Sequence, residues 1–277
     1  MLLRFISFSL LLFGYCTSVF AGAGARVVVA DGSLTEIVYA LGAEQDLVAV
    51  DSTSVYPSEA TKLPNVGYLR ALSSEGILSV QPDIFLTTQS AGPKKTLDDI
   101  QAAGVKLKQI NSAYSLAGVL DKIDQVALTF NKTSAAAPIK KRFEKQMNEQ
   151  VQALKAAFTQ SPRVLMFLNM QGNQLMAAGQ DTQAQALLDM LGWSNAAEGF
   201  RSYKPMSSEA MLAADADLIV VLQHGPTSAE LNKMLLMSRA AEQGRLLAID
   251  SSALLGFGIR LPSALAEIRQ KLSAAQP

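Results

Sequence analysis

Hydrophobic residues along the chain form short blocks that alternate with amphipathic stretches. A β-branched block at Arg26–Ala30 precedes the loop Asp31–Ser33 and a helical pattern over Leu34–Leu41. A second block at Arg163–Leu168 precedes a helical pattern over Gln183–Leu191. Short apolar strands that alternate with helices are typical of parallel sheets with helices on both faces. The pattern therefore predicts an α/β fold.

The same pattern occurs twice in the chain. The segment Leu72–Leu86 aligns with Met206–Val220, and each copy predicts a helix, a tight turn and a buried strand. A pair of serines can cap each helix, and Glu75 and Glu209 occupy equivalent positions in the first turn, where an acidic side chain favours the helix dipole. The repeat predicts two lobes that share one plan.

A different kind of segment separates the two copies. Helical apolar spacing covers Ser115–Phe130, and a long, polar, Ala-rich stretch follows over Ser134–Phe158. Because a proline suits the first turn of a helix better than its interior, we expect this second helix to run from about Pro138 to Phe158, roughly 30 Å at about 1.5 Å per residue. A helix of that length can bridge two lobes, so the chain is predicted to cross between them once.

These elements predict two Rossmann-like lobes with parallel sheets, joined by one long interlobe helix. We assign residues 22–132 to an N-terminal lobe, 133–160 to the interlobe helix and 161–277 to a C-terminal lobe. Open parallel sheets bind ligands at the carboxyl ends of their strands, and clefts between domains are common small-molecule sites. We therefore expect a ligand between the lobes.

Residues 1–21 have the layout of a secretory signal peptide. They carry one positive charge, Arg4, then an apolar run over Phe5–Phe13, and they end in a small-x-small pattern at Ala21. The run is shorter than the roughly 20 apolar residues that a permanent anchor requires, and a short membrane anchor is the alternative interpretation. We expect an exported protein, with cleavage at Ala21 or a few residues later.

Composition and missing motifs narrow the function. The single cysteine, Cys16, follows Tyr15, which does not suit a lipoprotein cleavage site, so the mature chain is predicted to hold no disulfide. The 24 basic and 24 acidic residues form no basic stripe that would indicate nucleic acid. One histidine, no Gly-x-Ser-x-Gly elbow and no phosphate-binding loop argue against most hydrolases, metal enzymes and nucleotide enzymes. We expect a binding protein rather than an enzyme.

Three segments of these lobes resemble the haem-binding branch of the helical-backbone periplasmic binding proteins. The most specific is Asn65–Ser79, which contains Gly-Tyr-x-Arg-x-Leu-Ser; the others are Met176–Gln180 and Leu254–Arg260. This class serves ABC importers and carries haem, ferric siderophores or cobalamin. The resemblance implies a monomeric periplasmic carrier that captures haem between its lobes and delivers it to an inner-membrane permease with its ATPase.

Tyr68 is the candidate axial ligand of the haem iron that the resemblance implies. A phenolate is a hard anionic donor that suits ferric haem. A free tyrosine has a pKa near roughly 10, so ligation requires removal of its proton, and the metal and a nearby cation both favour this removal. Arg70, two residues on, is placed to help. The alternative is a tyrosine packed at a loop edge beside a solvated arginine.

Arg260 follows a Gly-rich turn at Gly256–Gly258 and precedes a predicted helix over Pro262–Leu272. The resemblance implies that this arginine lies near the tyrosine or the haem propionates. The chain departs from the family pattern at Ile259, where a proline is common, so the turn is expected to be less rigid. A surface arginine ahead of a helix is the alternative interpretation.

Two further residues are candidates for contact with the ligand. Some relatives place a histidine after the first strand of the second lobe, but this chain has Met170 there, which could offer a thioether or simply fill an apolar wall. The only histidine, His224, follows the predicted strand Leu218–Leu222 and should lie near the cleft. It could bind iron or a propionate, or be an ordinary loop residue.

Glu75 and Glu209 are candidates for docking. The resemblance implies that one exposed glutamate on each lobe contacts arginines of the permease, and a role as first-turn acids is compatible with this. Two alternatives for the whole protein remain open. One is a carrier of the same class for a ferric siderophore or cobalamin, and the other is an extracytoplasmic haem chaperone that uses no transporter.

Overall fold

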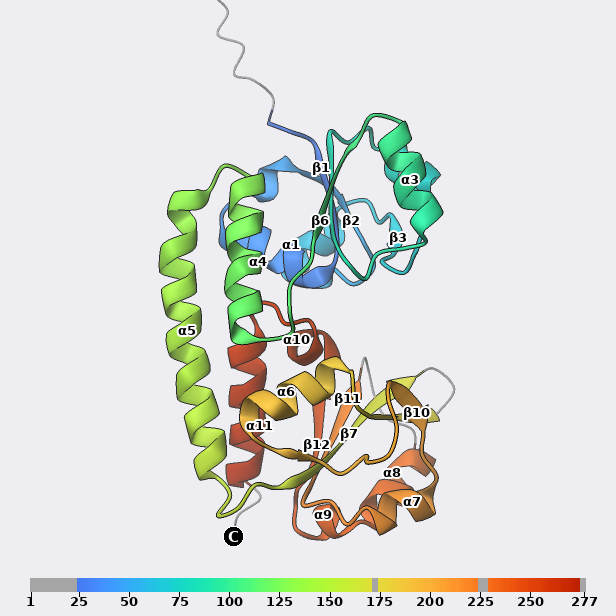
Figure 1. Cartoon of the computed structure of the whole chain (residues 1–277), viewed down its shortest axis with the longest axis vertical. Helices are drawn as coiled ribbons and strands as arrows, with labels where there is room; N and C mark the ends of the chain where they lie inside the picture. Colours follow the sequence, from blue (N-terminus) through green and yellow to red (C-terminus); the bar gives the residue numbers. More distant parts are fainter. Residues whose placement is uncertain (1–23, 171–173, 224–228, 275–277) are drawn as a thin grey trace, which may run out of the picture.

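The computed structural model describes residues 24–170, 174–223 and 229–274, which form two α/β lobes beside a long helix (Figure 1). The N-lobe sheet is entirely parallel, in the order β2-β1-β5-β6. Its strands are β1 (Val27–Ala30), β2 (Leu47–Val50), β5 (Ile84–Thr88) and β6 (Lys106–Ile110), and a separate hairpin pairs β3 (Gly67–Tyr68) with β4 (Ala71–Leu72). Its helices are α1 (Gly32–Ala40), α2 (Ser74–Leu78), α3 (Lys94–Ala102) and the 3₁₀ turns η1 (Glu44–Asp46) and η2 (Ser58–Lys62).

The C-lobe sheet has the order β10-β8-β7-β11-β12, with β9 beside β7. Its strands are β7 (Arg163–Met170), β8 (Gln174–Ala178), β9 (Ser194–Asn195), β10 (Tyr203–Pro205), β11 (Leu218–Gln223) and β12 (Leu246–Asp250). Its helices are α6 (Gln183–Leu191), α7 (Ser208–Ala213), α8 (Ala229–Leu236), α9 (Arg239–Glu242), α10 (Ser251–Leu255) and α11 (Leu261–Ala274). Strands β7, β11 and β12 are parallel, whereas β8 and β10 are antiparallel to their neighbours.

One long helix, α5 (Thr133–Ala156), joins the lobes. Helix α4 (Leu116–Thr129) leads into α5, which runs along both lobes and packs against α4 and then α11 (Figure 1). The predicted start at Pro138 is wrong, because α5 begins five residues earlier at Thr133. A proline this near the beginning removes only one helix hydrogen bond, and water can replace it because Pro138 is exposed. In the described part of the chain, no helix is both long and apolar enough to span a membrane.

The internal repeat is confirmed by matched hydrogen bonds in the two lobes. The Arg26 N–H donates to Asp83 Oδ2 at 2.8 Å, and the Arg163 N–H donates to Asp217 Oδ2 at the same distance. Asp83, in the turn before β5, thus contacts the start of β1, and Asp217, in the turn before β11, contacts the start of β7. The predicted fold class is confirmed, with two α/β lobes joined by one long helix.

The C-lobe sheet differs from the predicted all-parallel plan in its β8–β10 segment. Only three residues separate β7 from β8, and a connection this short permits antiparallel but not parallel pairing. The hydrophobic pattern contains no signal for this, because β8 and β10 are five and three residues long. The extra strands extend the sheet on the side of β7 away from β11.

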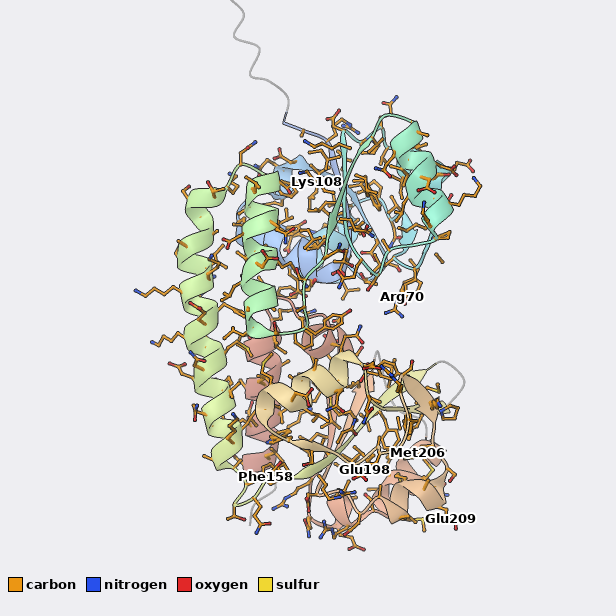
Figure 2. All side chains as sticks on the ribbon, in the orientation of Figure 1. Arg70, Lys108, Phe158, Glu198, Met206 and Glu209 are labelled. Carbon is orange, nitrogen blue, oxygen red and sulfur yellow. The ribbon has the colours of Figure 1, made fainter. Side chains whose placement is uncertain are left out.

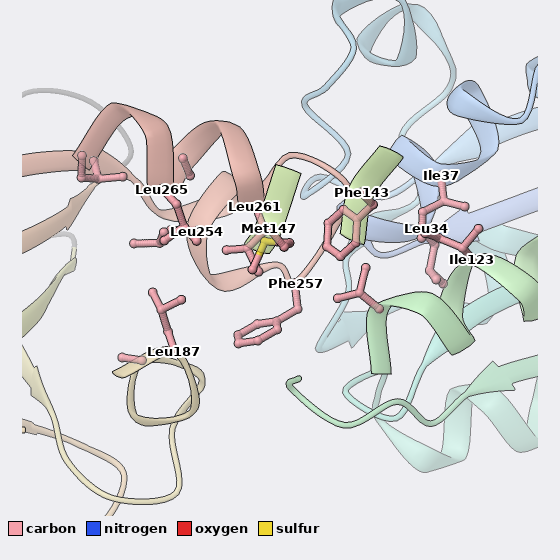
Figure 3. Close-up of a cluster of buried hydrophobic side chains, with 14 of the residues drawn as sticks. Leu34, Ile37, Ile123, Phe143, Met147, Leu187, Leu254, Phe257, Leu261 and Leu265 are labelled. Atoms are coloured by element: carbon pink, nitrogen blue, oxygen red, sulfur yellow. The ribbon is translucent and has the colours of Figure 1, made fainter. Parts of the chain in front are cut away.

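One buried apolar cluster passes through both lobes (Figure 3). Its members come from the N-lobe, α5 and the C-lobe, and include Leu34, Ile37, Ile123, Phe143, Met147, Leu187, Leu254, Phe257, Leu261 and Leu265. Burial of each large side chain contributes about 1.5–3 kcal/mol. The lobes therefore meet through a packed core, which resists changes in their relative orientation.

Candidate ligand-binding site

A groove of about 500 Å³ lies where the lobes meet. Val55 lines it from the N-lobe, and the C-lobe contributes Gln223, Ala248, Ile249, Asp250, Glu267 and Lys271. Several of these residues end β11 and β12, and the carboxyl ends of strands are the usual ligand side of an open α/β sheet. The volume is within the range of small-molecule sites, about 300–1,000 Å³. However, none of Tyr68, Arg70 and Arg260 lines this groove.

Tyr68 lies on the β3–β4 hairpin, which is attached to the N-lobe sheet by backbone hydrogen bonds. The Ser52 N–H donates to the Gly67 carbonyl at 2.8 Å, and the Gly92 N–H donates to the Leu69 carbonyl at 3.0 Å. Gly67 has a φ of +100°, which favours glycine. The Tyr68 side chain is 48% exposed although the neighbouring Leu69 is buried. The hairpin therefore presents the phenol to solvent on a fixed backbone.

Arg70 follows at the turn of the same hairpin, and its exposed side chain extends from the N-lobe toward the C-lobe (Figure 2). Its charge acts on Tyr203, which lies on β10 of the other lobe. Burial raises the pKa of Tyr203 to about 12, while hydrogen bonds at the start of α6 and the Arg70 charge oppose this rise. The hairpin and β10 thus face one another across the space between the lobes.

Tyr203 belongs to a polar group that the sequence interpretation missed. Its hydroxyl lies 3.5 Å from Gln183 Oε1, and Gln183 Nε2 donates to the Tyr114 hydroxyl at 3.2 Å. Tyr114 precedes α4, so this second bond connects the two lobes. The repeat contained a usable signal, because its alignment places Tyr203 opposite Leu69, between Tyr68 and Arg70.

The guanidinium of Arg260 is engaged by protein groups. It donates to Glu36 Oε1 at 2.7 Å, to Asp250 Oδ2 at 3.2 Å and to Ser252 Oγ at 2.9 Å. It also lies over the ring of Tyr56, 4.6 Å from the ring centre. Burial raises the pKa of Glu36 to about 7, against the opposing effect of Arg260. The structure therefore places Arg260 at the junction of the lobes with these partners.

Met170 and His224 mark the ends of adjacent C-lobe strands. Met170 is the last residue of β7, where its backbone pairs with Gln174. His224 follows β11 directly and lies outside the described residues. Within the described ranges, no group of three or more His, Cys, Asp or Glu side chains could hold a metal ion. The roles proposed for both residues stay predictions.

Glu75 and Glu209 occupy the first turns of α2 and α7, and both side chains are exposed. Ser73 accepts from the N–H of the third residue after it, and Ser207 does the same in the second copy. Figure 2 shows Glu209 on the outer part of the C-lobe, away from Arg70. The two acids are therefore presented on matched, capped helices, one on each lobe.

Residues 27–251 match the family model of the periplasmic binding protein. Among solved structures, the chain is similar to the periplasmic heme-binding protein RhuT from Roseiflexus sp. RS-1 in apo form, with 34% identity, a TM-score of 0.82 and coverage of 91% of this chain and 99% of that chain. It is also similar to the periplasmic heme-binding protein BhuT in complex with two hemes, with 34% identity, a TM-score of 0.80 and the same coverage.

One curated relative is named for vitamin B12, whereas the similar solved structures are named for heme. The vitamin B12-binding protein of Yersinia pestis (strain Pestoides F) is 26% identical over 205 residues, which cover 73% of this chain and 70% of that protein. The periplasmic heme-binding protein HutB of Vibrio cholerae is 33% identical with a TM-score of 0.75, over 91% of this chain and 99% of that chain.

Proposed function

Because the chain belongs to the periplasmic binding protein family, we propose that it captures haem between its lobes in the periplasm and delivers it to the permease of an ABC transporter. The observation that carries the proposal is the half-exposed Tyr68 phenol, held on the β3–β4 hairpin beside Arg70. The heme-binding proteins similar to this chain at 33–34% identity support the same ligand. The family is a class of substrate-binding proteins for transport, which agrees with the absence of catalytic motifs in the sequence.

Tyr68 would bind the ferric iron as a phenolate. The hairpin contributes a fixed backbone, so little backbone freedom is lost on binding. Arg70 contributes a positive charge on the same hairpin, which would stabilise the iron-bound phenolate. The proton leaves to solvent, because the side chain is exposed rather than enclosed. These two residues account for ligation from one side of the haem.

The opposite face of the haem would lie against the C-lobe. Met170 ends β7, and His224 follows the adjacent strand β11 in the sequence; we propose each of them as a contact of the haem iron or of a propionate. With no histidine aligned on the β7 side, we expect ferric haem to be five-coordinate. Arg260 completes our set of ligand-site residues, and its contacts favour an indirect role.

Delivery and export complete the proposal. Residues 1–21 direct export and are removed, and the mature monomer meets the permease and its ATPase at the inner membrane. Glu75 and Glu209 contact arginines of the permease, one from each lobe. Carboxylates at the rim of an interface raise the association rate and orient the partners more than they raise the affinity. Docking through these two fixed acids would therefore not require a large closure of the lobes.

A titration with hemin tests the ligand. Purified protein is mixed with hemin and, separately, with cyanocobalamin, and the visible spectrum and bound fraction are measured. We expect saturable hemin binding with a tyrosinate-type charge-transfer band and no saturable binding of cyanocobalamin. Saturable cyanocobalamin binding without a hemin spectrum would favour the second candidate, which the 26%-identical vitamin B12-binding relative motivates. Hemin binding without transport in a reconstituted permease would instead support a transporter-independent chaperone.

A further inference from the structure

The turn Gly256–Arg260 connects α10 to α11 and packs against the N-lobe, far away in sequence. Its contacts with Glu36 of α1 and Lys122 of α4 form a group that we call the interlobe joint: Glu36, Lys122 and Gly256–Arg260. Phe257 in this turn has a φ of +47° and is buried in the shared apolar cluster. A non-glycine residue with such a φ is held by its surroundings at some conformational cost.

Lys122 crosses the boundary from the N-lobe side. Only 5% of the residue is exposed, and its ammonium donates to Ser33 Oγ at 2.9 Å and to the carbonyls of Phe257 at 3.1 Å and Gly256 at 3.4 Å. Burial lowers the pKa of Lys122, while Asp31 and Glu36 oppose this. Burying an ammonium costs several kcal/mol unless its donors are satisfied, and two of its three acceptors belong to the turn.

Arg260 crosses the same boundary in the opposite direction. Its Nε donates to Glu36 Oε1 at 2.7 Å, and the Glu36 side chain is only 4% exposed. On the C-lobe side the same guanidinium contacts Asp250 and Ser252, so one planar group bridges both lobes. Displacement of either lobe would leave a buried charge without its partner, which is strongly unfavourable.

The fit of the turn is close as well as polar. A Cβ atom placed on Gly258 would lie 2.7 Å from Glu36 Oε2 and 3.1 Å from Ser33 Cβ, both of them on α1 of the N-lobe. Such contacts are too short to form without movement. Because Gly258 has no side chain, the turn can pack this closely against α1 of the N-lobe.

We propose that Lys122, Glu36 and Arg260 are positioning residues that fix the spacing and orientation of the lobes, and that α5 alone does not fix them. The two cations donate across the boundary in opposite directions, so displacement of either lobe breaks both links. Arg260 also holds the ring of Tyr56 at the edge of the interlobe groove, which Val55 lines. This proposal concerns the geometry of the site and holds whichever ligand the groove takes.

The test measures the distance between the lobes directly. Nitroxide labels are placed on exposed alanines of α3 and α7, Ala102→Cys and Ala213→Cys, in the chain from residue 22 onward, which contains no other cysteine. Pulsed electron paramagnetic resonance then gives the distribution of distances without ligand. The wild-type joint should give one narrow distribution. The Glu36→Met and Lys122→Met double variant should widen it by about twofold or more, because both links are lost.

A matched control removes a charged contact that stays within one lobe. Arg239→Met eliminates the ion pairs with Asp215, at 2.9 Å, and Asp217, at 2.5 Å, which lie wholly in the C-lobe. The distribution of this variant should equal that of the wild type. If the double variant is less stable but its folded molecules keep the narrow distance distribution of the wild type, the joint contributes only stability. That result overturns the proposal.

Gly258→Ala gives a second, independent reading. Because the added methyl group meets α1, this variant should shift the mean distance without widening the distribution. If the double variant does not fold, Ser33→Ala removes one acceptor of Lys122 and should widen the distribution by a smaller amount. Unchanged distributions in both Gly258→Ala and Ser33→Ala would mean that α5 sets the geometry by itself.

Discussion

The two lobes carry tyrosines at nearly equivalent positions of the repeat, and these tyrosines lie in opposite environments. In the N-lobe, Tyr68 is half exposed and lies beside Arg70. In the C-lobe, the repeat places Tyr203 at nearly the same point, yet this phenol is packed against the start of α6, and burial raises its pKa to about 12. Burial disfavours the phenolate form of Tyr203. The duplicated scaffold thus exposes the tyrosine that we propose as the iron ligand and buries its counterpart as a neutral hydrogen-bonding group.

The largest effect is expected from the exposed tyrosine of this comparison, Tyr68. Tyr68→Phe should weaken hemin binding by about 100-fold or more, because the iron loses its anionic donor, and should abolish the tyrosinate-type charge-transfer band. Visible absorption during a hemin titration measures both. Tyr114→Phe is a suitable control, since it changes a tyrosine at the junction of the lobes. An unchanged spectrum and affinity in Tyr68→Phe would refute the assignment.

The next effect concerns the acids that the two lobes share. Glu75→Ala combined with Glu209→Ala should leave hemin affinity intact while uptake through a reconstituted permease falls by about tenfold, because orientation on the permease is lost. Each single change should give a partial defect, which shows whether both lobes contribute. Transport at the normal rate in the double variant would reduce these residues to first-turn acids.

Arg70 offers a sharper reading of the N-lobe environment. Arg70→Ala should weaken hemin binding by about tenfold at about pH 6 and by less at about pH 9, because its help in removing the phenolic proton matters most where protons compete. Hemin titrations at both values, with Arg201→Ala on the opposite lobe as control, measure the difference. Equal losses at the two pH values would argue against this role.

A fourth prediction addresses the joint where the lobes meet. Because the folded protein binds the Glu36 proton more tightly than the unfolded chain does, this group favours folding most below about pH 4.5, and that contribution is lost as the pH rises to about 7. One pKa unit corresponds to about 1.4 kcal/mol, so a few kcal/mol is the upper limit.

Glu36→Gln should flatten this pH dependence in denaturant unfolding curves measured across that window. The exposed Glu44→Gln is the matched control. If the slope of stability against pH were the same in Glu36→Gln and the wild type, Glu36 would not be the titrating group.

The smallest effect tests the buried member of the opening comparison. Tyr203→Phe should leave the haem spectrum unchanged and lower affinity by at most about threefold, because only a neutral hydroxyl is removed. Loss of the charge-transfer band in this variant would reverse the roles that we give to Tyr68 and Tyr203.

Local patterns in the sequence predicted the architecture well, because they depend on nearby residues. The strands at Arg163 and Leu218, the helix Gln183–Leu191 and the repeated acid positions follow from periodicity and capping, and the structure has them. The Gly-Tyr-x-Arg segment was likewise readable as a motif. Only the start of α5 was misplaced in the long helix, since Pro138 was given too much weight.

Contacts between distant residues were not predictable from those patterns. Arg260 and Glu36 are 224 positions apart, and no spacing rule relates them. A lysine such as Lys122 is ordinarily expected at the surface, so its burial had no sequence signal. Tyr203 could have been found by extending the repeat, but its burial depends on how α6 packs against β10, which only the tertiary structure reveals.

The position of the interlobe joint in the chain has a consequence for folding order. One partner, Glu36, is near the beginning of the chain, while the turn that contacts it, Gly256–Arg260, is near the end. A chain that emerges from its amino terminus can complete its first lobe early, but it cannot close this contact until the last helix is available. The joint therefore forms late in folding. Its formation is expected to be slow, because it brings together residues that are far apart in the sequence.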